Sequence, residues 1–169
     1  ETILYHAAAG GVGLVACQWA RAIGVTMIGT VSTEAKAEVA RAHGCAHTIV
    51  TGGMTPEDMA REIPRQVREI TGGKGVPVVY DSVGKDTFMG SLDCLQPRGL
   101  LAVFGNGSGP VAAFDINLLA AKGSLYVTRP TLVTYTSKRE DLEPMAAELF
   151  EMIKSGKVKI EINQTYALK

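Results

Sequence analysis

The chain has 169 residues, 46% of them hydrophobic, and its 17 basic residues balance its 17 acidic residues. This length suffices for one domain with a substantial core, and the composition is that of an ordinary globular protein. The zero net charge, without a basic stripe, argues against nucleic acid or an anionic membrane as a partner, and no apolar run is long enough to span a membrane.

Three cysteines, Cys17, Cys45 and Cys94, are scattered along the chain. Their odd number and their spacing favour a reducing compartment over a disulfide framework, and we expect a cytoplasmic protein. Cys17 and Cys94 lie on apolar helical patterns, which predicts that both pack in the core. The three histidines match no common metal-binding spacing, and we expect no metal site in this chain.

Strand and helix patterns alternate along the chain. The predicted strands are 2–6, 26–31, 46–50, 77–81, 99–104 and 124–128. The predicted helices are 12–23, 33–42, 55–71, 86–95, 114–121 and 142–155. Most of the strands are continuous apolar runs, which is typical of parallel strands covered by helices on both faces. The pattern predicts a doubly wound, parallel six-stranded sheet in a three-layer α/β/α arrangement, the Rossmann fold.

Two local features qualify this pattern. Pro64 is expected to kink or interrupt the helix 55–71, because proline removes a helical N–H and clashes with the preceding turn. After Lys157 the pattern fades, and residues 157–169 are expected to form an extended tail that needs a partner surface.

The turn between the first predicted strand and the first helix is rich in glycine. Residues 8–13 read AAGGVG and fit the pattern GxGxxG with alanine at the first position. Such a turn aims backbone N–H groups and the positive end of a helix at one place, where a pyrophosphate fits. Gly10 stands where the backbone must approach the phosphates, and Gly13 where the helix must pack tightly on the strand. The turn predicts a dinucleotide site.

The end of the strand 26–31 indicates which dinucleotide is bound. A site for NAD normally has an acidic residue there to hold the ribose 2′-hydroxyl. This chain has Val31 instead, followed by Ser32 and Thr33. If Thr33 caps the next helix, Lys36 lies in its first turn and can reach back to the strand end. These groups favour NADPH over NADH, and the alternative is a capped helix with an ordinary surface lysine.

Two later strand ends carry small and polar residues. Ser82 follows the fourth strand, and Asn106 and Ser108 alternate with glycines after the fifth. Ligands of doubly wound folds collect at the carboxyl ends of the strands, so these segments allow a nicotinamide ribose to lie across the sheet edge. We interpret Asp81 as a turn or helix cap.

Six segments carry a family resemblance. They read HAAAGGVG (6–13), QWA (18–20), VYDSVG (79–84), SLDCL (91–95), FGN (104–106) and GSLYVTRP (123–130). Together they resemble the quinone oxidoreductases, the zeta-crystallin-like, zinc-free branch of the medium-chain dehydrogenases/reductases. The resemblance covers nearly the whole chain in order, and the run that ends in TRP is more specific than the glycine turn.

The resemblance implies the cofactor domain of an enzyme that transfers a hydride or electrons from NADPH to a quinone, with no catalytic residue in this chain. The implied cofactor contacts are Ala9, Gly10, Gly11 and Val12 for the pyrophosphate, Ser32 and Lys36 for the 2′-phosphate, Ser82 near the adenosine, and Phe104, Asn106 and Ser108 toward the nicotinamide. Some members also use an aromatic residue for the 2′-phosphate where this chain has Thr51-Gly52-Gly53.

The resemblance also bears on assembly and on the rest of the enzyme. It implies a homodimer paired through the edge strand Ser124 to Thr128, which an exposed apolar edge would fit. A separate catalytic, GroES-like domain precedes the glycine turn in this family, so residues 1–169 look like a single NADPH-binding domain, inert in isolation. A zinc-dependent alcohol dehydrogenase and an enoyl reductase of the same superfamily stay open as alternatives.

Overall fold

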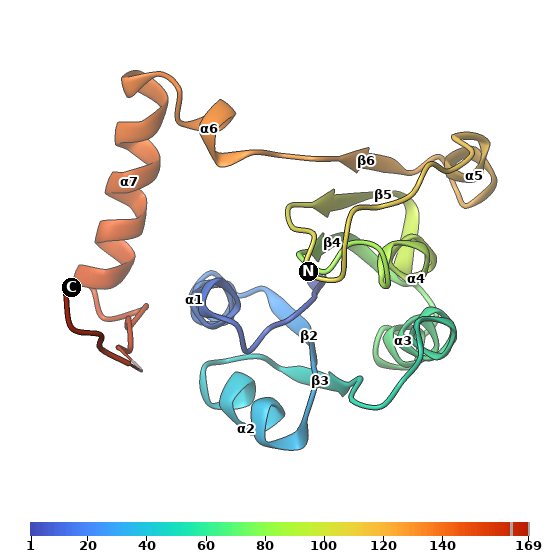
Figure 1. Cartoon of the computed structure of the whole chain (residues 1–169), viewed down its shortest axis with the longest axis horizontal. Helices are drawn as coiled ribbons and strands as arrows, with labels where there is room; N and C mark the ends of the chain where they lie inside the picture. Colours follow the sequence, from blue (N-terminus) through green and yellow to red (C-terminus); the bar gives the residue numbers. More distant parts are fainter. Residues whose placement is uncertain (163, 169) are drawn as a thin grey trace.

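The computed structural model describes residues 1–162 and 164–168, and its centre is a parallel sheet with helices on both faces (Figure 1). The strands are β1 (Thr2–Tyr5), β2 (Thr26–Val31), β3 (His47–Val50), β4 (Val76–Asp81), β5 (Leu95–Val103) and β6 (Tyr126–Thr128). The helices are α1 (Gly11–Ala22), α2 (Glu34–Ala42), α3 (Pro56–Ile70), α4 (Phe88–Cys94), α5 (Asn117–Ala121), α6 (Leu132–Tyr135) and α7 (Arg139–Lys154).

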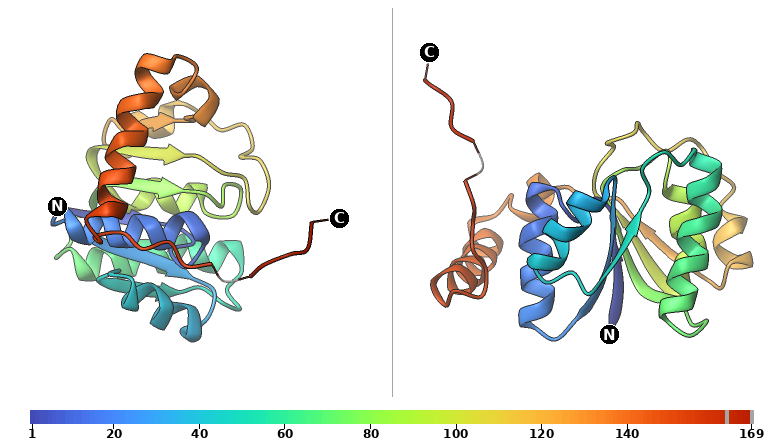
Figure 2. Two further views of the ribbon diagram at one scale, coloured as in Figure 1. Left: turned by 90° about the vertical axis from the view of Figure 1, so that its left-hand side faces the viewer. Right: turned by 90° about the horizontal axis from the view of Figure 1, so that it is seen from below.

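The six strands lie in the order β3-β2-β1-β4-β5-β6, and every pair is parallel. Helices α1 and α2 cover one face of the sheet, and α3 and α4 cover the other (Figure 2). The chain winds from β1 to β3 in one direction and then returns to β4 on the other side of β1. This arrangement confirms the predicted doubly wound Rossmann fold, with its switch point between β1 and β4.

The apolar strands place one hydrophobic cluster on each face of the sheet. The cluster under α3 and α4 includes Leu4, Val79 and Leu101, all fully buried. The cluster under α1 and α2 is built from smaller side chains, among them Ala8 and Cys17. Cys17 and Cys94 are both buried, as their apolar surroundings predicted.

Pro64 does not interrupt its helix, and the prediction of a break there is wrong. Helix α3 runs unbroken from Pro56 to Ile70 with Pro64 inside it. A capping box holds its first turn, because the Thr55 hydroxyl accepts from the Asp58 amide while the Asp58 carboxylate accepts from the Thr55 amide. Pro64 is itself buried with its neighbour Ile63. Packing around the proline and the capping box at the start of the helix therefore outweigh the lost helical hydrogen bond.

The C-terminal third differs most from the predicted elements. Strand β5 begins at Leu95, directly after α4, and its pairing with β4 shifts register between Val76 and Val78. Helix α6 has no counterpart among the predicted helices, and α7 begins three residues before position 142. Helix α7 stands away from the sheet, joined to β6 by an extended segment and α6 (Figure 1).

The segment after α7 returns to α1. The side-chain amide of Gln18 donates to the Lys159 carbonyl at 3.0 Å and accepts from the Lys159 amide at 2.8 Å. Val158 is buried beside this contact, whereas Ile162 and Tyr166 are more than four-fifths exposed. Of the predicted tail 157–169, residues 163 and 169 lie outside the described residues. No helix in the described part of the chain is long and apolar enough to cross a membrane.

The β1–α1 turn leaves no room for a side chain at its last glycine. A Cβ at Gly13 would lie 2.5 Å from the Ala8 carbonyl oxygen and 2.7 Å from that of Ala7. Both obstacles are backbone atoms, which cannot rotate away as a side chain can. The helix can therefore begin against the end of β1 only because position 13 is glycine, as the motif predicted.

We expect Gly13→Ala to lower the free energy of unfolding by about 1–3 kcal/mol, the usual cost of overpacking. Gly11 in the same helical turn is a matched control, because a Cβ there meets nothing within 4 Å. Gly11→Ala should therefore cost nothing and can add helix propensity. Urea unfolding followed by circular dichroism measures both, and equal stabilities for the two variants would contradict the packing argument.

Candidate functional site

A pocket of ≈ 260 Å³ opens at the carboxyl edge of the sheet, beside the switch point. Its lining residues are Ala7, Ala9, Gly10, Thr30, Val31, Ser32, Lys36, Thr51 and Val83. They come from the ends of β1, β2, β3 and β4 and from the first turn of α2. Four of the predicted cofactor contacts thus meet in one cavity: two from the glycine turn, Ser32 directly after β2 and Lys36 in the first turn of α2.

The glycine turn presents backbone donors rather than side chains. One backbone bond closes the bend, from the Gly10 amide to the Ala7 carbonyl at 2.9 Å. Gly10 is the N-cap of α1, and within the described residues no side chain caps this helix. The first amides of a helix have no partner inside the helix, and they carry the positive end of its dipole. The exposed residues Gly11 and Val12 begin this uncapped turn.

The end of β2 carries the cationic part of the site. The Thr33 hydroxyl accepts from the Lys36 amide at 3.2 Å and so caps α2. The Lys36 ammonium reaches back and donates to the Ser32 hydroxyl at 3.0 Å. Val31 occupies the place where an NAD site has its acid, and it is buried. The geometry that the sequence suggested for these residues is therefore present, with a hydroxyl and an ammonium side by side.

The carboxylate next to the Thr33 cap is held by a neighbouring cation. Glu34, in the first turn of α2, forms an exposed ion pair with Arg41 at 2.6 Å. Arg41 also donates to the Thr48 hydroxyl on β3 at 2.6 Å. The Glu34 charge is balanced by this ion pair.

The loops after β4 and β5 are bonded to each other. The Ser108 hydroxyl donates to the Val83 carbonyl at 3.0 Å and accepts from the Asp86 amide at 3.0 Å. A Cβ at Gly105 would lie 2.4 Å from the Ser82 carbonyl oxygen, so only glycine permits this approach. The Ser82 hydroxyl in turn donates to the His6 carbonyl at 3.4 Å. The two serine contacts predicted in these loops, Ser82 and Ser108, therefore already bond the backbone of neighbouring segments.

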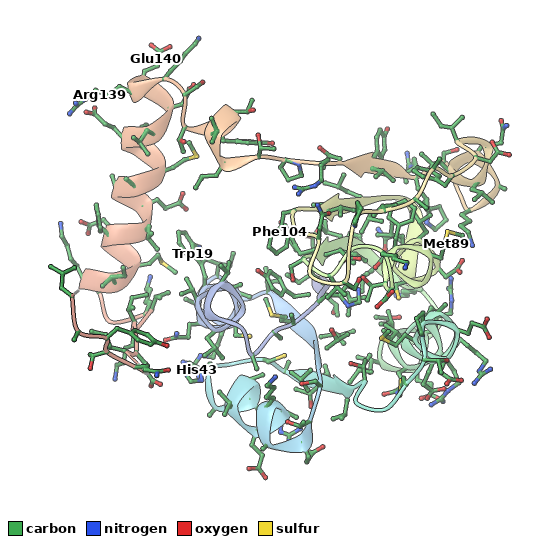
Figure 3. All side chains as sticks on the ribbon, viewed as in Figure 1. Trp19, His43, Met89, Phe104, Arg139 and Glu140 are labelled. Atoms are coloured by element: carbon green, nitrogen blue, oxygen red, sulfur yellow. The ribbon has the colours of Figure 1, made fainter. Side chains whose placement is uncertain are left out.

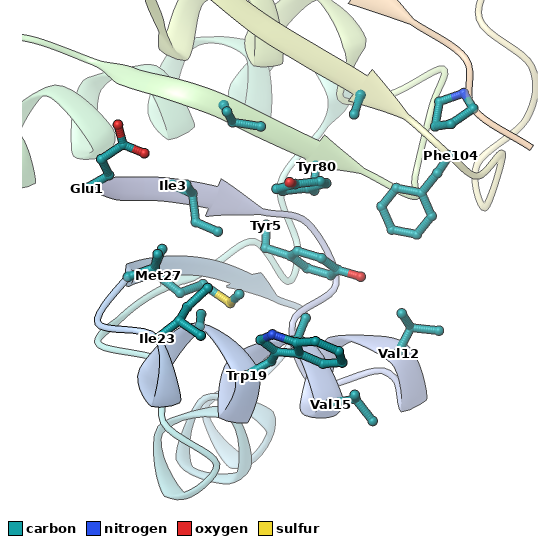
Figure 4. Close-up of a pocket in the computed structure, with 16 residues that line it drawn as sticks. Glu1, Ile3, Tyr5, Val12, Val15, Trp19, Ile23, Met27, Tyr80 and Phe104 are labelled. Carbon is teal, nitrogen blue, oxygen red and sulfur yellow. The ribbon is translucent and has the colours of Figure 1, made fainter. Parts of the chain in front are cut away.

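A larger apolar groove of ≈ 630 Å³ lies on the sheet face beside α1 (Figure 4). Trp19 of α1 and Phe104 after β5 line it, and Figure 3 shows both on the same side of the molecule, with Arg139 and Glu140 far off at the start of α7. The ring of Tyr5 lies 5.8 Å from those of Tyr80 and Phe104. Burial raises the pKa of Tyr5 to about 12, with smaller contributions from Cys17 and Tyr80, so its hydroxyl stays neutral.

Seven of the ten predicted contacts line three separate cavities, four of them in the smaller pocket, whereas Gly11, Ser82 and Ser108 line none of these three. Val12 and Phe104 line the groove, at its end next to the glycine turn. Asn106 is exposed and lines a separate pocket of ≈ 550 Å³ with Phe88 and Arg129. The structure adds lining residues that the sequence did not indicate as contacts: Ala7, Thr30, Thr51 and Val83. Of these four, only Thr30 could have been noticed in the sequence, because it is a polar residue near the end of an apolar strand.

The described residues contain no group of three or more His, Cys, Asp or Glu side chains that could hold a metal ion. His6 is fully buried, and burial lowers the pKa of its imidazole while the nearby Asp81 opposes that shift. The ring is therefore neutral near pH 7.

Comparisons with known proteins agree with this geometry. A family model described as zinc-binding dehydrogenase matches residues 11–151. A quinone oxidoreductase of Pseudomonas aeruginosa is 58% identical over 99% of this chain and 50% of its own length. A 2-haloacrylate reductase of a Burkholderia species is 48% identical over 100% of this chain and 49% of its own. The crystal structure of an Escherichia coli quinone oxidoreductase complexed with NADPH superposes with a TM-score of 0.87, at 51% identity over 96% of this chain and 48% of that one.

The chain therefore spans about half the length of these relatives. The family's description names zinc, but the described residues do not supply a zinc site of their own. The relatives confirm the resemblance to quinone oxidoreductases that the six sequence segments indicated. These residues form a Rossmann domain of the dinucleotide-binding type, similar to the one in quinone oxidoreductases. Because the family model covers most of the chain, the chain belongs to the zinc-binding dehydrogenase family.

Proposed function

We propose that residues 1–169 form the NADPH-binding domain of a quinone oxidoreductase. The observation that carries the proposal is the Lys36 ammonium, which lies 3.0 Å from the Ser32 hydroxyl at the end of β2. An NAD site has a carboxylate at this strand end, and this chain has a cation and a hydroxyl instead. The complex of the similar Escherichia coli enzyme with NADPH supports the same choice.

In this proposal the pyrophosphate lies against Ala9, Gly10, Gly11 and Val12. The uncapped amides of α1 donate to its oxygens, and the helix dipole favours their negative charge. The glycines fit this role because a Cβ at Gly10 would already lie 3.2 Å from the Ala7 carbonyl oxygen, and at Gly11 the space is open. A phosphate can therefore approach the backbone itself.

The 2′-phosphate is assigned to Ser32 and Lys36. A lysine donates to phosphate as a point charge, and the N-terminus of α2 adds to the local positive potential. Arg41 holds the Glu34 carboxylate in an ion pair, so that this charge is balanced near the phosphate. The segment Thr51-Gly52-Gly53 lies near the place where some members have an aromatic residue, and Thr51 lines the same pocket.

The nicotinamide end is assigned to the side of Phe104, Asn106 and Ser108, with Ser82 near the adenosine. NADPH supplies a hydride equivalent, which together with a proton reduces a quinone to a hydroquinone. The chain's own part is to bind and orient the dinucleotide and to exclude water, since no acid–base pair in it is assigned to catalysis. Within this proposal the isolated domain binds the cofactor and does not turn over.

We expect Lys36→Ala to weaken NADPH binding about tenfold or more while leaving NADH binding nearly unchanged, because only NADPH carries the 2′-phosphate. Fluorescence titration of the chain with each nucleotide measures the two dissociation constants. Lys74→Ala is the matched control, since Lys74 is an exposed lysine in the loop before β4, at the other edge of the sheet. Equal affinities of the unaltered chain for NADPH and NADH would overturn the assignment of the cofactor.

A second reaction is favoured by the similarity to the 2-haloacrylate reductase, which is 48% identical to this chain. Reduction of an activated carbon–carbon double bond would use the same domain and the same cofactor. Assays of the full-length protein with NADPH and either a quinone or a 2-haloacrylate distinguish the two. We expect the quinone to have the higher kcat/KM, and preference for the acrylate would replace our proposal with the second reaction.

We further propose that this domain pairs in a homodimer through the edge segment Ser124 to Thr128, in a cytoplasmic enzyme. Strand β6 ends the sheet, and its Tyr126 is 62% exposed. Charged residues on an edge strand oppose strand pairing between chains. Light scattering should therefore report a dimer for the unaltered chain and a monomer for Tyr126→Lys. A monomer in both cases at high protein concentration would contradict this interface.

A further inference from the structure

A chain of buried side chains links three strand ends at the edge of the crevice. His6 follows β1, Thr30 is near the end of β2 and Asp81 ends β4; Ser91 lies on α4. The His6 ring meets the Thr30 hydroxyl through Nδ1 at 3.0 Å and the Ser91 hydroxyl through Nε2 at 2.9 Å. Ser91 donates to Asp81 Oδ2 at 2.9 Å. None of these four residues is more than 4% exposed.

The Asp81 carboxylate fixes which group donates and which accepts in this series of hydrogen bonds. It accepts from the amides of Val83 and Gly84, at 2.8 and 3.0 Å, and from the Thr87 hydroxyl. These donors fit an ionised carboxylate, which accepts hydrogen bonds and donates none. The Ser91 hydroxyl must therefore point at Asp81 and accept from His6.

The same order of donors and acceptors continues through the imidazole ring of His6. His6 carries its proton on Nε2, to donate to Ser91, and its bare Nδ1 accepts from the Thr30 hydroxyl. The Thr30 oxygen keeps a lone pair for one more donor, and that donor is the Ala7 amide at 3.2 Å. An oriented series of bonds thus runs from the Ala7 amide of the glycine turn to the Asp81 carboxylate.

Ala7 is the residue that needs such support. Its φ is +56°, in the left-handed region that a residue with a Cβ occupies at a cost. Strained conformations persist where the surroundings hold them in place. Here the Ala7 amide is bonded to the Thr30 side chain, and the next amide, of Ala8, donates to the Thr30 carbonyl at 3.0 Å.

We propose that His6 and Asp81 are positioning residues for the dinucleotide: through Ser91 and Thr30 they hold the glycine turn in the conformation that receives the pyrophosphate. This inference rests on the proposed function for its ligand. Neither side chain lines the pocket, whereas Ala7, Thr30 and Val83, which they hold, all do. Asp81 is thus more than the turn cap of its own loop, because its charge orders the bonds at the end of β1.

The tautomer of the His6 ring tests the donor-to-acceptor direction of these hydrogen bonds, and the test needs no ligand. Long-range ¹H–¹⁵N correlation spectra of the 169-residue chain at pH 7 should show His6 neutral and protonated on Nε2. In Asp81→Asn the amide oxygen still accepts from Val83 and Gly84, so the amide nitrogen must donate to Ser91. We expect the Ser91 hydroxyl to turn toward His6 and the proton to move to Nδ1. A proton on Nδ1 in the unaltered chain, or no change in Asp81→Asn, would overturn the direction.

A matched pair at Thr30 tests the positioning role. Thr30→Val keeps the shape and loses the hydroxyl, whereas Thr30→Ser keeps the hydroxyl and loses a methyl group. We expect Thr30→Val to speed hydrogen exchange of the Ala7 amide and to raise the dissociation constant for NADPH about tenfold, because the part-buried Ala7 amide and the fully buried His6 ring both lose their hydroxyl partner. Thr30→Ser should stay within about threefold of the unaltered chain by both measures.

Thr48→Val is the control for losing a strand hydroxyl outside the chain of bonds, since Thr48 bonds Arg41 at the surface. It should alter neither the His6 tautomer nor the exchange of the Ala7 amide. Unaltered NADPH affinity and Ala7 exchange in Thr30→Val would overturn the positioning role. If the unaltered chain bound no dinucleotide, the proposed function would fall, while the Ala7 exchange rates would still decide whether the turn is held in this way.

Discussion

The close approach of α1 to the end of β1 is the constraint on which the rest of the site depends. The helix starts where the backbone oxygens of Ala7 and Ala8 leave no space for a Cβ at Gly13. Because the helix begins there, its unpaired amides open directly onto the carboxyl edge of the sheet. A larger residue at this position would push α1 away from β1, and the backbone donors of its first turn would move with it.

A buried polar network is the second half of this arrangement. Hydrophobic packing fixes which strands are neighbours, but it is not directional and does not orient a turn. The bonds among His6, Thr30, Ser91 and Asp81 are directional, and each of their polar atoms has a partner. A partly satisfied network would cost more than an apolar core, so its completeness is what makes it tolerable in the interior.

The proposed cofactor site is built mostly from backbone and small residues, with charge at one end. Lys36 is the one cation among the residues that line the smaller pocket, and its ammonium reaches back to Ser32, directly after β2. A separate apolar groove lined by aromatic rings such as Phe104 lies on the sheet face beside α1. A dinucleotide likewise combines charged phosphates with a flat aromatic ring.

Much of the site could be predicted because its parts are close in sequence. The Thr33 cap and the reach of Lys36 to Ser32 span three and four residues, and helix geometry alone brings such positions together. Thr51 and Val83 also line the pocket, but they come from other strands and no local pattern marked them. The Ser82 and Ser108 hydroxyls, predicted as cofactor contacts, bond the backbone of neighbouring segments.

By itself, the sequence determined the sheet, the glycine turn and the absence of an acid at the end of β2, because periodicity and turn chemistry are local. It did not determine that Pro64 lies inside an unbroken helix, since burial on both sides decides that. Only the tertiary structure decided that His6 meets Ser91, 85 residues away along the chain. That contact depends on the order of the strands, and strand order arises from packing over the whole sheet rather than from any one segment.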